Sequence, residues 1–176
     1  MNETQLLRQQ CELESRQIRE IAALCAGAST LTPISDDFSI ACATYLKYVG
    51  ERCEARDADH EARLRAAGTD HERVDLQRLG TQLRARRDAL SALAAASPHP
   101  AEPLSPPTHA ALRRYCALLA QSREDSTALM TAAARRYSVA DWRAVARVDA
   151  DSIREERRLR TEVLRLSDER GNARGP

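Results

Sequence analysis

Apolar side chains recur every three or four residues along most of this chain, which is the spacing of helices that each bury one face. The first half of the sequence contains three such stretches, at about residues 3 to 26, 35 to 68 and 69 to 96. Residues suited to helix capping stand at two of the starts, namely Ser35 or Asp36 and the capping box of Thr69 with Glu72. The predicted buried faces are Leu7, Cys11, Ile18, Ala22 and Cys25; Phe38, Cys42, Tyr45, Val49 and Cys53; and Leu76, Leu79, Leu83, Leu90 and Leu93.

A proline-rich segment, residues 97 to 107, separates these stretches from the rest of the chain. It holds five prolines in eleven positions, so we expect a connector, since proline lacks the backbone N–H that helices and strands use. A fourth helix is predicted from 108 to 136, and a fifth from 139 to 167 behind a capping box of Ser138 and Asp141. Their predicted faces are Leu112, Tyr115, Leu119, Leu129 and Ala133, and Trp142, Val145, Ile153, Leu159 and Val163.

Long amphipathic helices joined by short loops pack as antiparallel neighbours. The sequence therefore predicts an all-α protein, an antiparallel up-down four-helix bundle over residues 1 to 137. Residues 138 to 167 are expected to form a C-terminal helix that packs on the bundle or extends from it, and residues 168 to 176 a disordered tail. The low aromatic content, 3%, and the abundance of Ala, Leu and Arg agree with helices rather than sheets.

Charge and motif content narrow the functions that this chain could carry. The 27 Lys and Arg residues nearly balance the 26 Asp and Glu residues, so no basic field is expected to bind nucleic acid. No apolar run reaches the roughly 20 residues that span a bilayer, so no membrane partner is expected. Neither a glycine-rich phosphate loop nor a Gly-x-Ser-x-Gly turn is present, and no Ser or Cys has a His and an acid in a readable motif, so we do not expect an enzyme.

Five cysteines occur without a Cys-x-x-Cys pair and without a signal peptide, which predicts reduced thiols inside a cytoplasmic helical protein. A buried reduced cysteine behaves as a small apolar side chain. A thiol-based redox sensor that uses Cys42, Cys53 or Cys116 is the competing interpretation. Only Arg52, next to Cys53, is placed to lower a thiol pKa and so to favour that role.

Polar residues interrupt the predicted apolar faces near their middles. Ser15 stands in the first face, Arg56 and His60 in the second, and Ser122 and Asp125 in the fourth. Polar positions at matching depth on facing helices are how helical bundles build metal or ligand sites. Each of these residues could instead lie at the edge of its face and reach water, so both a polar core pocket and a solvated edge remain open.

Three segments are similar, in order and spacing, to one known family. The segment EDSTALMTAAARRYSVADW has a pair of acids, an apolar pair, a short spacer, then Ser, an acid and Trp, and the segments ESRQIREIAALC and TDHERVDLQRL precede it. Over about residues 7 to 148 the chain resembles a hemerythrin-like domain of the bacterial cation-binding type. The resemblance implies a four-helix bundle with a di-iron site between the helices.

The positions that hold iron ligands in that family are largely changed here. Where the first helix of that family offers a His, this chain has Ser15, and where the second offers a His and a Glu, it has Arg56 and His60. His71 matches the His of the third helix, and Asp75 stands a turn later. Where the fourth helix offers a His and an acid, this chain has Gln121 and Asp125. A di-iron site needs roughly five to seven His and carboxylate ligands, more than the chain keeps. Arg56 also adds a fixed positive charge, which disfavours a bound cation.

We therefore expect a polar core pocket in which Arg56 is at least half buried and forms an ion pair with an acid of another helix, Asp125 being the first choice. The predicted members of this pocket are Ser15, Arg56, His60, His71, Gln121, Ser122 and Asp125. The alternative is a metal site, iron being the expected ion, with the ligands His60, His71, Asp75 and Asp125.

The predicted function is that of a non-enzymatic regulatory or interaction protein without a cofactor. The alternative is an iron-binding, hemerythrin-like sensor of dioxygen, nitric oxide or redox state. The C-terminal helix exceeds what closing a four-helix bundle requires, so we expect it to bind a protein partner or to mediate self-association, unless it folds back over its own bundle. The predicted contact residues are Ile153, Leu159, Val163, Arg157 and Arg158.

Overall fold

The computed structural model describes most of the chain, and within the described residues every regular element is an α-helix, which confirms the all-α class. The helices are α1 (Glu3–Ala28), α2 (Asp36–Ala67), α3 (Asp70–Ala96), α4 (Pro106–Gln121), α5 (Arg123–Arg136), α6 (Val139–Ala146) and α7 (Ala150–Asn172). The described residues are 2–28, 36–67, 70–96, 104–146 and 149–172, without the side chains of 36, 70–75, 125, 171 and 172.

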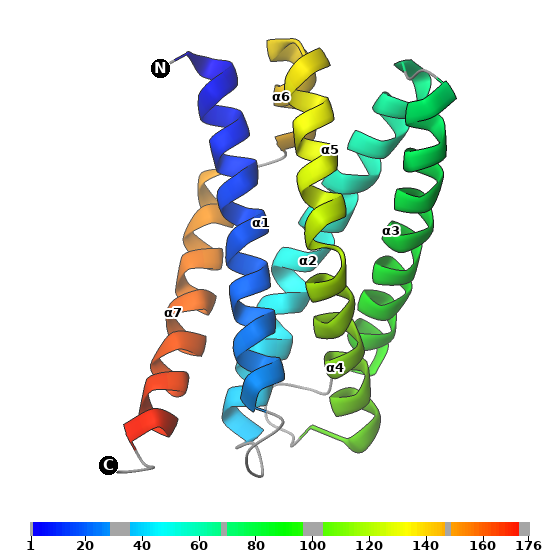
Figure 1. Cartoon of the computed structure of the whole chain (residues 1–176). Helices are drawn as coiled ribbons and strands as arrows, with labels where there is room; N and C mark the ends of the chain where they lie inside the picture. Colours follow the sequence, from blue (N-terminus) through cyan, green and yellow to red (C-terminus); the bar gives the residue numbers. More distant parts are fainter. Residues whose placement is uncertain (1, 29–35, 68–69, 97–103, 147–148, 173–176) are drawn as a thin grey trace.

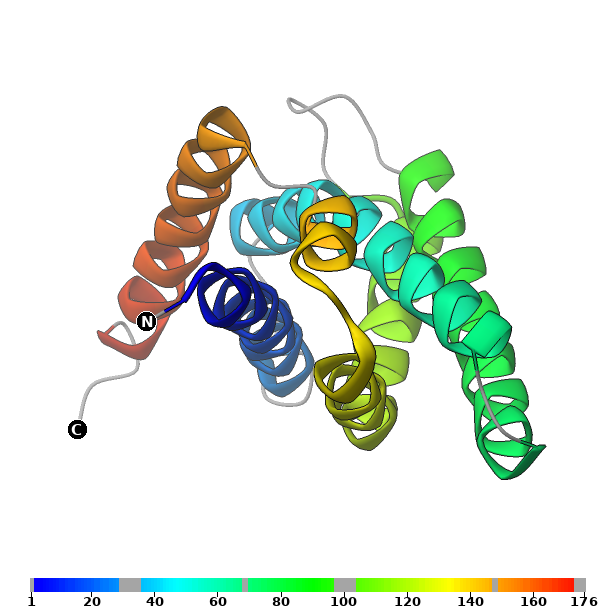
Figure 2. The ribbon, with the colours of Figure 1, turned by 90° about the horizontal axis from the view of Figure 1, so that it is seen from above.

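The long helices lie roughly along one axis, and each runs opposite to the one before it (Figure 1). The α4–α5 pair acts as one rod with a break between its halves. α1 packs against α2 and α4, and α3 packs against the same two helices. α6 lies at the end where α1 starts, and α7 runs along the outside against α2 and α1 (Figure 2).

The first three helices begin and end close to the predicted stretches. Prediction and structure differ at the connector, because α4 starts at Pro106 rather than after residue 107. Ser105 caps this helix, and its Oγ accepts a hydrogen bond from the Thr108 N–H at 3.4 Å. Proline suits the first positions of a helix because their N–H groups have no intrahelical acceptor.

The predicted fourth helix is broken at Ser122 into α4 and α5. Little backbone pairing is lost, since the Ser122 N–H donates to the Leu118 carbonyl at 3.0 Å and the Ser126 N–H donates to the Ser122 carbonyl at 2.9 Å. The Ser122 hydroxyl donates to the Leu119 carbonyl at 3.3 Å, a side-chain bond of the kind that competes with helix backbone. Ser122 and Ser126 are both buried and face the core.

The predicted fifth helix is likewise two helices, α6 and α7. The capping box that starts α6 is confirmed, since the Ser138 N–H donates to Asp141 Oδ2 at 3.0 Å and the Asp141 N–H donates to Ser138 Oγ at 3.3 Å. α7 continues to Asn172, so the expectation of a disordered tail from residue 168 is wrong for residues 168–172. Among the described residues, every helix falls short of the uninterrupted apolar length that crossing a membrane requires.

The predicted apolar faces form the core, and all of their members are buried except Leu7 and Ile153, which are half-buried. The largest core cluster includes Leu159 and Val163 of α7, which are 7% and 0% exposed. The C-terminal helix therefore folds back over its own bundle. The expectation that Val163 contacts a partner is wrong, because helix packing within the chain covers it fully, whereas Leu159 keeps a 7% exposed edge.

Candidate functional site

The buried face of α2 passes from apolar to polar residues without a change of register. Arg56, His60 and Leu64 follow Cys53 at helical spacing, and they are 0%, 0% and 1% exposed. A charged side chain without solvent needs partners that offset its lost hydration. Here the partners come from the helices packed around α2.

Arg56 forms a buried ion pair with Glu14 of α1. Its Nη1 donates to Glu14 Oε2 at 2.6 Å, and its Nη2 donates to Ser15 Oγ at 2.9 Å and to Cys53 Sγ at 3.4 Å. Both members of the pair are 0% exposed. The expected burial of Arg56 and its pairing with an acid of another helix are confirmed, with Glu14 as an acid that the sequence had not indicated. The side chain of Asp125, the first choice, lies outside the described residues.

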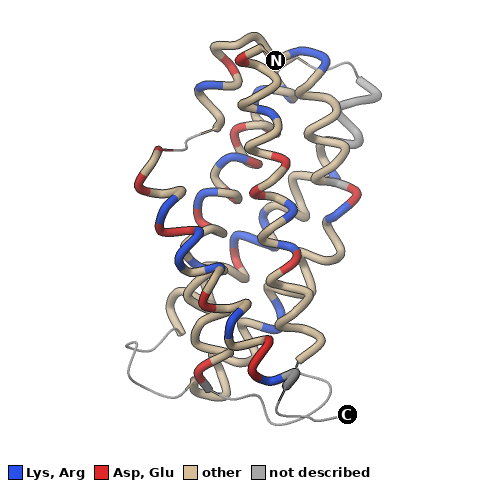
Figure 3. Tube along the Cα trace, turned by 90° about the vertical axis from the view of Figure 1, so that its left-hand side faces the viewer, with Lys and Arg blue, Asp and Glu red and all other residues tan. Residues whose placement is uncertain are grey.

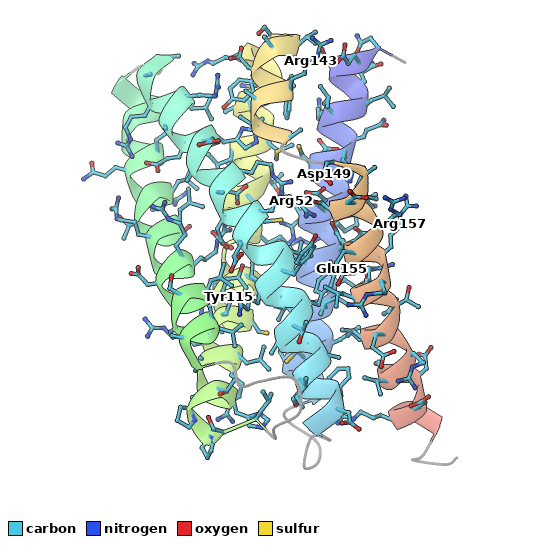
Figure 4. All side chains as sticks on the ribbon, turned by 180° about the vertical axis from the view of Figure 1, so that it is seen from behind. Arg52, Tyr115, Arg143, Asp149, Glu155 and Arg157 are labelled. Atoms are coloured by element: carbon cyan, nitrogen blue, oxygen red, sulfur yellow. The ribbon has the colours of Figure 1, made fainter. Side chains whose placement is uncertain are left out.

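Glu14 also links this pair to α7. Arg52, labelled in Figure 4, lies one turn before Arg56 on α2, and its Nε is 3.5 Å from Glu14 Oε2. Arg52 forms a second ion pair with Glu156 of α7. Gln10 donates to Glu14 Oε1 at 3.1 Å, so both oxygens of this carboxylate are bonded. One chain of charges thus joins α1, α2 and α7.

A second group of ion pairs is centred on Arg86 of α3, which is 3% exposed. Its Nε and Nη2 donate to Glu54 Oε2 at 3.0 and 2.8 Å, and Nη2 also donates to Asp57 Oδ2 at 2.6 Å. Its Nη1 donates to Ser122 Oγ and Ser126 Oγ at 3.0 and 3.2 Å. A guanidinium has five N–H groups. The donors of Arg86 therefore all have acceptors, supplied by α2 and by the α4–α5 break.

Tyr115 of α4 completes the group around Glu54. Its Oη donates to Glu54 Oε1 at 3.0 Å, so both oxygens of this carboxylate are bonded as well. Gly50 makes room for the tyrosine, which Figure 4 labels: a Cβ at position 50 would lie 2.7 Å from Tyr115 Oη and 3.1 Å from Leu90 Cδ1. The glycine is required here by close packing, because any larger residue would push on the hydroxyl that bonds Glu54.

The paired charges determine which groups are ionised. Burial raises the pKa of Glu54 above its usual value, although Arg86 acts against that shift. Burial alone would also raise the pKa of Asp57, but Arg86 and Arg56 together hold it below its usual range. Burial would lower the pKa of Arg56 and of Arg86, but their neighbours outweigh it and raise both pKa values. These neighbours are acids beside both groups and the thiols of Cys53 and Cys11 beside Arg56. Arg56, Arg86 and the buried acids paired with them are called the ion-pair layer below. This layer therefore holds two permanent cations, the guanidinium groups of Arg56 and Arg86.

The space between the ion pairs is small. A cavity of about 10 Å³ lies between Ser15, Arg19, Asp57, Arg86 and Ser122, which is close to the room that one water molecule needs. Acidic and basic residues are interspersed along the helices of the whole bundle in the side view of Figure 3. The cavity between the ion pairs therefore has room for about one water molecule and not for a larger ligand.

His60 faces aromatic side chains. Its ring stacks on Tyr137 at a centroid distance of 5.3 Å, and Trp142 meets it edge-on at 5.7 Å. His60 Nδ1 lies 3.1 Å from Tyr137 Oη, while Nε2 has no hydrogen-bond partner among the described residues. Burial lowers the pKa of His60 to about 4, so the imidazole is neutral at pH 7.

The structure places part of the predicted polar pocket in the core and leaves part of it outside. Gln121 is exposed at the end of α4, so its assignment to the core is wrong, and the next residue takes the buried position instead. Among the described residues, no group of three or more His, Cys, Asp or Glu side chains is placed to hold a metal ion. The predicted members that are buried are Ser15, Arg56, His60 and Ser122. The members whose side chains lie outside the described residues are His71, Asp75 and Asp125, so the alternative metal site stays a prediction.

Sequence reasoning missed four acidic and basic members of the layer, two of which stand within the predicted apolar faces. Arg86 lies at helical spacing between Leu83 and Leu90, and Glu14 lies between Cys11 and Ile18. These two interruptions were as readable as Arg56. The other two missed members, which adjoin buried positions of α2, are Glu54 and Asp57.

All five cysteines are buried, and none forms a disulfide. Burial raises the pKa of the Cys53 thiol to about 12, although Arg56 and Arg52 act against it. The expectation that Arg52 could make this thiol reactive is therefore wrong. Arg157 and Arg158 on α7 are exposed, as a contact role would require, and Arg158 pairs with Glu155 of its own helix.

Comparison of this chain with models of protein families, with curated proteins and with solved structures finds no match.

Proposed function

We propose that this chain is a hemerythrin-like up-down four-helix bundle that works without metal, as a regulatory or interaction protein. The observation that carries the proposal is the layer of ion pairs around Arg56 and Arg86. This layer lies at the depth at which the family resemblance puts iron. It contains the guanidinium group of Arg56, which is fully buried, and that of Arg86, which is 3% exposed. Arginine keeps its charge at any physiological pH, so each group repels a cation at this depth.

The carboxylates of the layer support the same conclusion. Both oxygens of Glu14 and both oxygens of Glu54 accept hydrogen bonds from side chains, so an iron ion would have to compete with these donors for the carboxylates. Asp57 is held by Arg86 through Oδ2. Arginines thus perform the bridging between helices that metal ions would perform in a complete site.

A groove between α2 and α7 is the surface that we propose for a partner. It has a volume of about 380 Å³, its apolar lining residues are buried or half-buried, and most of its charged lining residues are exposed. A groove of this kind fits an amphipathic helix, whose apolar face meets the apolar residues and whose flanking charges meet the charged ones. We therefore assign the partner contact expected of the C-terminal helix to the side of α7 that lines this groove, and not to its buried apolar stripe. The lining residues are Asp37, Ile40, Ala41, Thr44, Arg158, Leu159, Glu162, Arg165 and Leu166.

Metal analysis tests the first half of the proposal. Protein purified from cells grown with added iron should contain less than about one iron per chain and show no oxo-bridged di-iron absorption. Two tightly bound irons per chain would overturn the proposal and favour the alternative, an iron-dependent sensor.

Site-specific cross-linking in cells tests the partner groove. A photoreactive amino acid at Thr44, which is exposed in the groove, should give covalent adducts with one protein partner or with a second copy of the chain. Thr81 on α3 is the matched control, since it is also exposed and bonds its own helix carbonyl in the same way. Equal labelling at both positions would contradict the groove as a specific contact surface.

A further inference from the structure

An apolar pocket lies between α2, α3 and α5. It has a volume of about 100 Å³, and among the described residues it shares no lining residue with the groove between α2 and α7. Leucines of all three helices form its walls, and they belong to one core cluster. These leucines are Leu64 of α2, Leu76 and Leu79 of α3, and Leu129 of α5.

The pocket exists because α5 brings short side chains to it. Ala128 and Ala132, one turn apart on α5, complete the apolar lining. α3 packs against α4 and α5 packs against α2, while α3 and α5 diverge from each other towards the start of α3 (Figure 1). Methyl groups are too short to fill the gap between two diverging helices, so the close packing typical of protein cores is not reached here.

The lining favours an apolar guest over water. A cavity of about 150 Å³ lined by apolar side chains stays dry and binds benzene, whereas a buried water needs roughly two to four polar partners. Here leucines and alanines form most of the lining, and Arg136 is the one charged residue among the described residues that line the pocket. A pocket of this size and lining therefore suits several carbon atoms of an alkyl chain.

A positive edge adjoins the apolar lining. Ala128, Ala132 and Arg136 are spaced by four residues and so form one row along α5. The same row borders an open hollow of about 560 Å³, which Arg135 also lines. Glu124 lines that hollow too, but it stands in the first turn of α5, about 16 Å from Arg135 along the helix axis. The negative end of a helix dipole amounts to roughly half a charge, so Arg135 and Arg136 leave the last turn of α5 with a net positive charge.

We propose that this pocket binds a medium-chain alkyl carboxylate, with the methyl end of the chain among the leucines and the carboxylate beside Arg136. Removal of the alkyl carbons from water supplies the affinity. A guanidinium group can bind a carboxylate through two parallel N–H···O bonds, and Arg136 is exposed, so the carboxylate keeps much of its hydration. The pocket and the partner groove are lined by different residues, so each can be tested without the other.

A chain-length series tests the proposal by isothermal titration calorimetry of the folded full chain. The probes are butanoate, hexanoate and octanoate, each used below the concentration at which micelles form. The affinity should rise about fourfold for each added methylene until the pocket is filled, with one molecule bound per chain at saturation. Octylammonium has the same chain and the opposite charge. It should bind at least about tenfold more weakly than octanoate, because Arg135 and Arg136 attract an anion and repel a cation.

Variants of the lining locate the binding. Ala132→Leu should lower the affinity for octanoate at least about tenfold, because the longer side chain fills the pocket. Ala94→Leu is the matched control, since Ala94 is also a half-buried helical alanine but does not line the pocket, and it should leave the affinity unchanged. Arg136→Gln should remove most of the difference between octanoate and octylammonium, while Arg157→Gln on the exposed face of α7 should preserve it.

Octanoate that binds Ala132→Leu as tightly as wild type would overturn the proposal, as would octylammonium that binds wild type as tightly as octanoate. Absence of saturable octanoate binding by wild type would do the same, including the case in which vesicles of anionic phospholipid retain the protein instead. The comparison of the two head groups uses the wild-type chain, so it decides the question even where a variant fails to fold.

Discussion

Oε2 of Glu14 lies 2.6 Å from Nη1 of Arg56, and neither side chain reaches solvent. Two charges removed from water this fully lose several kcal/mol of hydration, which their attraction offsets only with good geometry and further hydrogen bonds. Ser15 bonds the arginine, and Gln10 and Arg52 contact the acid. The pair therefore matters most when one of its members is removed.

Replacing Arg56 by alanine should destabilise the fold by about 3 kcal/mol or more, because Glu14 then stays buried without its main partner. Arg56→Met combined with Glu14→Leu should recover much of that loss, since neither charge is left unpaired. Urea unfolding followed by circular dichroism measures both. Arg154→Ala, on the exposed side of α7, is the control and should change little. An Arg56→Ala variant as stable as this control would contradict the role of the pair.

The register of each helix could be predicted because burial follows the 3.6-residue period. Arg56 and His60 continue the face of α2, so their burial was readable without a structure. The identity of the acid opposite Arg56 was not, because it depends on how far α1 slides and rotates against α2. The break at Ser122 also escaped prediction, since its hydroxyl meets Arg86 from a helix far away in the sequence.

Gly50→Ala should destabilise the protein by about 1–3 kcal/mol, because its Cβ would approach Tyr115 Oη to 2.7 Å and must displace it. That displacement also weakens the hydrogen bond from Tyr115 to Glu54. Gly27→Ala is the matched control: it lies in α1, a Cβ there meets nothing within 4 Å, and alanine is the better helix former. The midpoint of thermal unfolding should fall in Gly50→Ala and rise in Gly27→Ala. A Gly50→Ala protein as stable as wild type would show that Tyr115 can shift without a cost in stability.

Stability should fall as the pH drops from about 6.5 towards 4, in part because of His60. The unfolded chain binds a proton near the ordinary histidine pKa of 6.5, whereas the buried imidazole binds one only near pH 4. The contribution of neutral His60 is therefore complete above pH 6.5 and is lost below it, by up to about 1.4 kcal/mol per pH unit.

His60→Phe isolates this effect, because phenylalanine keeps a ring against Tyr137 and Trp142 but cannot titrate. Between pH about 7 and pH about 5, the urea midpoint should fall less in the variant than in wild type. Asp57, whose pKa is also lowered, is present in both proteins and does not affect the comparison. An equal fall of the urea midpoint in both proteins would mean that the imidazole gains a proton in the folded state as easily as in water.

Removal of α7, by ending the chain at residue 148, should destabilise the bundle rather than only reduce its association. α7 contributes Leu159 and Val163 to the core, and its loss also leaves Arg52 without Glu156. The sequence analysis placed the complete four-helix bundle within residues 1 to 137, which would leave such a truncated chain folded. The burial of these two side chains reverses that expectation.

Leu159→Ala tests the same point without deleting a helix. It should cost about 2 kcal/mol or more, because a buried leucine leaves a cavity against α2. Further contacts hold α7 in place and limit how far it can move to fill that cavity: Arg160 pairs with Glu20 at 2.7 Å, and the Arg170 guanidinium lies 4.8 Å from the centre of the Phe38 ring. Arg157→Ala, on the exposed face, should leave the urea midpoint nearly unchanged. If Leu159→Ala and Arg157→Ala unfold at the same urea concentration, α7 does not belong to the core, and its apolar stripe would again be available to a partner.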